Sequence, residues 1–184
     1  MLWQNSLETL LMTREFDMIN IFGEEELRPL VRFQKVIPGY YVSKDGKIYS
    51  SKSNKFLRPR KKYNANHHCE KRLKELAFNV IAPKDLITDY KFSDRSGKFK
   101  TVIELYISNH RATAETWMPI DEYPPDSLKD TWNDVPEAWR QWVRDTALID
   151  HIDDDPSNNH VDNLRWIIPK DNQADRKRHY YGTN

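Results

Sequence analysis

The residues with the clearest chemical potential lie in one short stretch of the sequence. Asp150 and His151 close an apolar run that begins at Ala147, and a polar, asparagine-rich segment follows them. Histidine is the side chain whose ordinary pKa suits removal of a proton from water near neutral pH. Hard divalent cations prefer carboxylate and amide oxygens as ligands. These residue types together indicate metal-assisted hydrolysis of a phosphodiester, in which charge must be neutralised on the phosphate and on the leaving oxygen.

Two strands and a helix are needed to position these side chains. The sequence predicts a strand that ends at His151, a polar loop, a second strand over 164–168 and a basic helix after Pro169, which together form a compact ββα unit. Neighbouring strand residues point to opposite faces, so Asp150 can face a cation while His151 faces the attacking water. Asn172, early on the helix, can supply a second oxygen ligand if that helix packs on the hairpin.

The same residues also have simpler interpretations. A histidine beside an aspartate in a loop is, taken alone, more often a surface pair than a catalytic one. The acidic run 153–155 could bind calcium, but an EF-hand loop that starts at Asp153 needs glycine at 158 and glutamate at 164, where Asn158 and Leu164 stand. The assembled pattern, and not any single residue, therefore favours a hydrolytic site.

This assembled pattern resembles the HNH nuclease motif of phage homing endonucleases. The resemblance implies that Asp150 and Asn172 bind one divalent metal ion, with Mg²⁺ expected and Mn²⁺ as the alternative, and that His151 is the general base. Asn163 would be the orienting residue, which in that family holds the histidine ring or the loop in place. The sequence departs from the family pattern at Asp154, where glycine is usual. The residues that carry the resemblance are Asp150-His151-Ile152-Asp153, Asn158-Asn159, Asn163-Leu164-Arg165-Trp166 and Asn172.

Two further stretches resemble segments of the same nucleases. Residues 37–50 with 57–59 resemble an N-terminal module thought to form a small sheet against DNA. Residues 110–119 resemble the helix, begun by His-Arg, that precedes the nuclease core, although the usual Leu-Val is Ala112-Thr113 here. The three matches cover roughly half of the chain, and they imply double-stranded DNA as the partner.

The charge pattern suits such a partner better than the net charge of +1 suggests. Residues 55–75 hold eight basic against two acidic residues, residues 115–155 hold twelve acidic against three basic residues, and residues 165–179 are again basic. Basic segments on both sides of an acidic one fit a polyanion and a metal site, although each charge could also be ordinary solvated surface. The residues expected to contact DNA are Arg58, Arg60, Lys61, Lys62, Arg111, Arg165, Lys170 and Arg176.

We expect an α+β fold, with a small N-terminal antiparallel sheet region and a C-terminal ββα-metal (HNH) nuclease core. The division predicted is a helical extension over 1–32, a DNA-binding sheet region with a basic segment over 33–101, and the HNH nuclease region over 102–184. The last has its core at 147–181 and an inserted acidic, helical segment at 119–146. Strands are predicted at 40–43, 48–50, 56–57 and 102–107, a strand pair turning at 94–98, and helices near 70–79 and 111–118. A further helix opens at Pro136, with Trp139, Trp142 and Val143 as its packing stripe.

The remaining features bound the class of protein. Cys69 is the single cysteine, which rules out an intrachain disulfide and a cysteine-rich zinc site. The sequence lacks a signal-peptide pattern and an apolar run long enough to span a bilayer, so no membrane partner is expected. We expect a soluble, phage-encoded enzyme in the cytoplasm of a bacterial host cell, acting as a monomer or dimer to nick or cut DNA. The alternatives are an HNH enzyme of the restriction or packaging kind and a catalytically inactive DNA-binding protein on the same scaffold.

Overall fold

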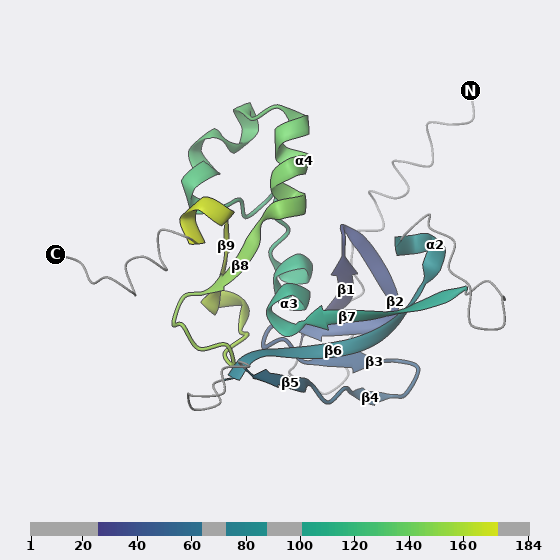
Figure 1. Ribbon diagram of the computed structural model, residues 1–184. Coiled ribbons are helices and arrows are strands. Elements are labelled where there is room, and N and C mark those ends of the chain that lie inside the picture. Colours follow the sequence, from purple (N-terminus) through teal and green to yellow (C-terminus); the bar gives the residue numbers. More distant parts are fainter. Residues whose placement is uncertain (1–25, 64–72, 88–100, 173–184) are drawn as a thin grey trace, which may run out of the picture.

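The computed structural model describes residues 26–63, 73–87 and 101–172, and it shows a mixed α+β fold built on antiparallel sheets (Figure 1). A four-stranded sheet contains β1 (Leu27–Arg32), β2 (Lys35–Ser43), β3 (Ile48–Ser50) and β4 (Lys55–Phe56). A three-stranded sheet contains β5 (Arg60–Tyr63), β6 (Leu73–Pro83) and β7 (Val102–Ser108), and a hairpin contains β8 (Leu148–His151) and β9 (Leu164–Ile167). The helices are α2 (Lys84–Ile87), α3 (Asn109–Trp117) and α4 (Glu137–Thr146), with 3₁₀ turns η1 (Asp126–Asp134) and η2 (Val161–Asn163).

The predicted N-terminal meander is confirmed as β2, β3 and β4. Its turn depends on Gly46, which has a φ of +79° and donates its amide to the carbonyl of Ser43 at 3.0 Å. A side chain at this position would also meet the Oδ1 of Asn109 at 2.5 Å. Glycine is therefore required twice, for the backbone conformation and for the close approach of α3.

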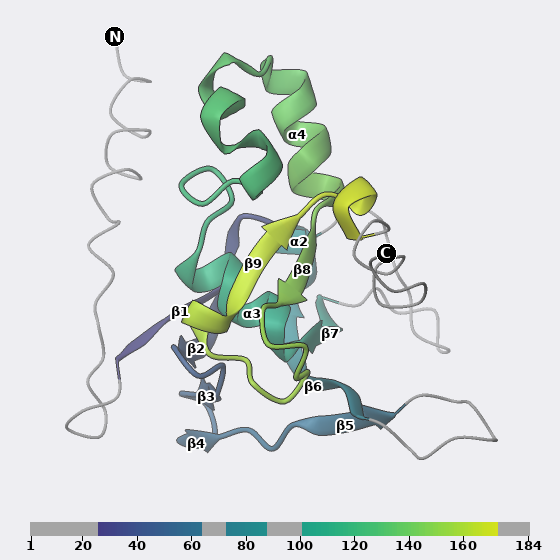
Figure 2. The same cartoon turned by 90° about the vertical axis from the view of Figure 1, so that its left-hand side faces the viewer.

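Helix α3 lies between the sheets and the β8–β9 hairpin, and the two views of the molecule agree on this (Figures 1 and 2). One of its faces packs into the core of the two larger sheets through Ala112 and Trp117, and Ala114 packs into a second core with the hairpin and α4. The Trp117 indole donates to the Val42 carbonyl at 3.1 Å, and the Trp166 indole donates to the Met118 carbonyl at 2.8 Å. The helix thus fixes the hairpin relative to both sheets.

Two predicted elements are corrected by the structure. The segment near 70–79 was expected to be helical, but its described part is the beginning of β6. Leu, Lys, Glu and Ala favour a helix in isolation, yet Phe78 and Val80 are buried on one face of a strand that pairs with β5 and β7. Likewise, residues 27–32 of the expected helical extension form β1, which pairs with β2. The rest of that extension and the turn at 94–98 lie outside the described residues.

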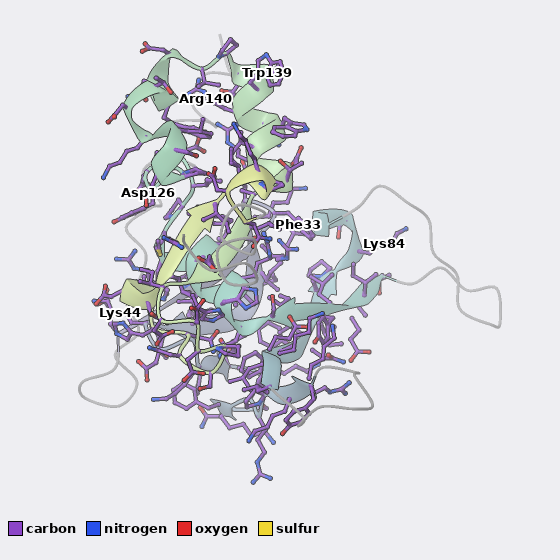
Figure 3. The ribbon with its side chains drawn as sticks, turned by 60° about the vertical axis from the view of Figure 1, so that its left-hand side comes forward. Phe33, Lys44, Lys84, Asp126, Trp139 and Arg140 are labelled. Atoms are coloured by element: carbon purple, nitrogen blue, oxygen red, sulfur yellow. The ribbon has the colours of Figure 1, made fainter. Side chains whose placement is uncertain are left out.

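The segment between α3 and β8 forms a lobe made of η1 and α4. Trp132 and Val143 are buried in it, and the Arg144 guanidinium bonds to Asp121 and Glu137, whose hydrogen bonds raise its pKa. The expected packing stripe of α4 is wrong in part: Val143 is buried, but Trp139 and Trp142 are 63% and 51% exposed. Figure 3 shows Trp139 and Asp126 in this lobe, with Lys44 outside the lobe and below it in this view.

Candidate active site

The predicted strand–loop–strand unit is present, and its register places the candidate residues. Strands β8 and β9 are antiparallel, with Asp150 opposite Arg165 and His151 opposite Leu164. Arg111 holds the hairpin on α3, because its guanidinium donates to the Ala147 carbonyl at 3.1 Å and also bonds to Glu115. The strand therefore delivers Asp150 and His151 to the edge of the loop, as the sequence predicted.

His151 has a defined hydrogen-bond partner, Asn159. The distance from His151 Nε2 to Asn159 Oδ1 is 3.2 Å, and Asn159 is 2% exposed. The Asn159 amide nitrogen donates to the carbonyls of Ser157 and Pro156, so its oxygen must face the histidine. A neutral imidazole that donates from Nε2 keeps its lone pair on Nδ1. This arrangement leaves Nδ1 as the basic atom that can accept a proton from water.

Asn163 was expected to hold either the His151 ring or the loop in place, and its contacts fit the second of these roles. Its side chain accepts from the Asp153 amide at 3.2 Å and donates to Asp153 Oδ1 and to the Asn158 carbonyl, each at 2.8 Å. Hydrogen bonds from Asn158, from the amide of Asp155 and from Asn163 hold the pKa of the Asp153 carboxyl below its usual range. Asn163 therefore secures the loop, and Asn159 contacts the ring.

The departure from the family pattern at Asp154 is accommodated by the backbone. Asp154 has a φ of +61°, and its amide donates to the His151 carbonyl at 3.1 Å. Aspartate and asparagine enter this left-handed conformation more readily than other residues that carry a Cβ, although glycine adopts it without a steric penalty. The turn after His151 thus has the conformation that a glycine would favour.

Asp150 is held by an ion pair across the hairpin. Arg165 donates to Asp150 Oδ2 through Nη2 at 2.6 Å and through Nε at 2.9 Å. Arg165 was expected to contact DNA, whereas in the structure its guanidinium is paired with Asp150, the expected metal ligand. Both bonds end on Oδ2, and the second carboxylate oxygen makes no hydrogen bond within the parts of the chain that the structure describes. A carboxylate with one oxygen unbonded in this way fits an oxygen-seeking divalent cation.

Asn172 is the last described residue of the helical turn that follows β9, where the helix of the predicted ββα unit was expected. Residues 169–172 form a helical turn directly after β9, and the Asn172 amide donates to the Ile168 carbonyl at 3.3 Å. Ile167, the last residue of β9 before this turn, pairs with Leu148. Asp150 lies two residues beyond Leu148 along β8, a distance on the order of 7 Å. No cluster of three or more His, Cys, Asp or Glu side chains suited to a metal occurs among the described residues. The two predicted metal ligands, Asp150 and Asn172, include only one side chain of these four types.

His110 lies beside His151, although no local sequence pattern gave it a role in the site. Its ring lies edge-on to that of His151, with the centroids 5.3 Å apart and the planes at 76°. Burial lowers the pKa of His110 to about 4, and the neighbouring His151 and Arg111 contribute in the same direction. The only signal in the sequence was its place in the stretch 110–119, because the contact with His151 is tertiary.

The expected DNA-contacting residues lie in different settings. Arg58, Arg60 and Lys61 are exposed on and before the edge strand β5, whereas Lys62 pairs with Glu75 at 2.8 Å. The register aligns Arg60 with Ala77, and Ala77 with Ser108, so β5 begins in line with the entry to α3. In both ribbon views the loop after His151 lies close to β5 and β6 (Figures 1 and 2). Lys170 is exposed, and Arg176 lies outside the described residues.

Comparison with known proteins gives one distant likeness. No family model and no curated protein matches the chain. A solved structure described as "DNA binding and cleavage by the HNH homing endonuclease I-HmuI" aligns with a TM-score of 0.39 and 20% identity, covering 80% of this chain. The chain spans 56% of the length of that protein. Among the described residues, no helix has the length and apolar character needed to cross a bilayer.

Proposed function

We propose that this protein is a metal-dependent endonuclease of the HNH type that hydrolyses phosphodiester bonds in double-stranded DNA. The observation that carries the proposal is the hydrogen bond between His151 Nε2, at the end of β8, and Asn159 Oδ1, which would leave Nδ1 as the base. Asp150 precedes it on the same strand and presents the carboxylate oxygen that Arg165 does not bind. A base and an oxygen ligand on adjacent strand residues are what the sequence predicted for this chemistry.

The residues divide the reaction between them. His151 takes the proton from the attacking water, and the resulting imidazolium keeps its hydrogen bond to Asn159. Asp150 and Asn172 would hold one Mg²⁺ or Mn²⁺ ion, which would supply charge neutralisation at the phosphate and at the leaving 3′ oxygen. Arg165, beside Asp150, holds that carboxylate in place on the hairpin. The exposed basic residues around β5 would bind the flanking phosphates.

An inactive DNA-binding protein on the same scaffold is the second candidate. The ion pair between Arg165 and Asp150 favours it, since a guanidinium already neutralises the carboxylate on which a cation should bind. The basic strand β5 would serve that function equally well. The two candidates differ in whether DNA is cut, and not in whether it is bound.

Incubation of the purified protein with supercoiled plasmid distinguishes these candidates. The assay is run with Mg²⁺, with Mn²⁺ and with a chelator, while binding to a labelled duplex is measured in parallel. The proposal predicts nicked or linear plasmid with a divalent cation and intact plasmid with the chelator. Binding without cleavage under all three conditions would establish the inactive binder instead.

A further inference from the structure

The imidazole of His110 is half-buried beside His151, and the proposed reaction gives it no role. It stands in the first turn of α3, between Asn109 and Arg111, and Asn109 is 5% exposed. Ala112, at the same end of the helix, is fully buried. Since the backbone here is fixed by packing on two sides, the His110 ring is presented to the hairpin from a rigid element.

The surroundings of His110 are unusual for a histidine. Its Nε2 lies 3.3 Å from Ser108 Oγ, while its Nδ1 is buried and has no hydrogen-bond partner in the described part of the chain. An unsatisfied buried polar atom costs free energy that an apolar ring would avoid. The ring is nevertheless packed edge-on against His151, at a centroid separation typical of aromatic pairs.

From this contact we infer that His110 is a positioning residue for His151. The inference rests on the proposed nuclease function of His151. Asn159 fixes one atom of the His151 ring, but a single hydrogen bond still permits rotation about that bond. The edge-on His110 ring restricts this rotation, so the two contacts together fix the orientation of the His151 imidazole plane. His110 acts through His151 and touches no reacting atom.

Two substitutions separate the ring contact from the ring nitrogens. His110→Phe keeps an aromatic edge against His151, and we expect its kcat for plasmid nicking to stay within about threefold of the wild type. His110→Ala removes the aromatic edge, and we expect kcat to fall by roughly 10- to 100-fold while KM for DNA is unchanged. Ser108→Ala, which removes only the partner of Nε2, serves as the control and should leave kcat unchanged. Urea unfolding of each variant verifies that it is folded under the assay conditions.

The imidazole ¹⁵N signals of His151 give a readout that does not depend on cleavage. We expect one dominant tautomer, protonated at Nε2, in the wild type and in His110→Phe, and a mixture of tautomers in His110→Ala. An unchanged kcat together with an unchanged tautomer in His110→Ala would overturn the inference and leave the nuclease function standing. Equal decreases of kcat in the Phe and Ala variants would overturn it as well, since the ring contact would then be irrelevant. A wild type that cuts no DNA would refute the proposed function, and the ¹⁵N signals would still test the contact.

Discussion

Asn159→Ala is the substitution that tests the geometry of the site in most detail. The Asn159 side chain is buried and bonds to His151 Nε2, to the Ser157 carbonyl and, at 3.4 Å, to the Pro156 carbonyl. Each such bond contributes about 1 kcal/mol net, so the substitution should lower the free energy of unfolding by about 2–3 kcal/mol. It also frees the His151 ring, for which we expect a fall in kcat of roughly 10- to 100-fold.

Asn163→Ala is the matched control, because Asn163 stands in the same loop and also makes three hydrogen bonds, none of them to His151. This substitution should lower the free energy of unfolding by a comparable amount, about 1–3 kcal/mol, but leave kcat within a few-fold of the wild type. Urea denaturation gives the stabilities, and plasmid nicking at saturating DNA gives kcat. If Asn163→Ala reduced kcat more than Asn159→Ala, with both variants folded, the assignment of the orienting residue would be refuted.

The same contacts support three further predictions. Asp154→Gly should raise the free energy of unfolding by about 0.5–1 kcal/mol in urea denaturation, because glycine adopts the left-handed backbone conformation at this position without a steric penalty. Asp155→Gly is the control, and it should lower the free energy of unfolding because it removes the acceptor of the Ser157 amide. The lowered pKa of His110 means that the unfolded chain binds the proton first, so stability should be full above pH 6.5 and fall toward pH 4, by up to about 3 kcal/mol. Burial is the main cause of this lowered pKa, His151 and Arg111 lower it further and Glu75 opposes them, and His110→Phe should flatten the pH dependence of urea unfolding. Arg165→Gln should tighten Mn²⁺ binding in calorimetry without DNA, since it removes a cation from Asp150; weaker binding would contradict that reasoning.

Local sequence signals predicted the elements that carry the site. An apolar run ending in Asp150 and His151, and an Asp-Gly turn at Gly46, are patterns whose physics acts within a few residues. The α3 helix and the β8–β9 hairpin were therefore predicted correctly. The segment around Leu76 was not, because its helix-forming residues are overridden by pairing with two other strands, a contact that no local pattern reveals.

The partners of individual side chains were harder to predict than the elements. The loop holds three asparagines, and which of them meets His151 depends on how the turns at Asp154 and Pro156 fold the chain. The same holds for His110, which reaches His151 from another element of the fold. The packing of Trp139 was overestimated because the spacing of apolar residues on a helix shows a stripe, but not whether anything covers it.

The role of His151 as the general base is tested most directly by the nicking rate of His151→Ala, measured beside the affinity of this variant for duplex DNA. His151 is half-buried at a strand end, and the substitution removes its hydrogen bond to Asn159 while the strand pairing stays intact, so the variant should remain folded. We predict that Mg²⁺-dependent plasmid cleavage is abolished, while the dissociation constant for DNA changes by no more than about threefold. Undiminished cleavage by His151→Ala would show that His151 is not the base.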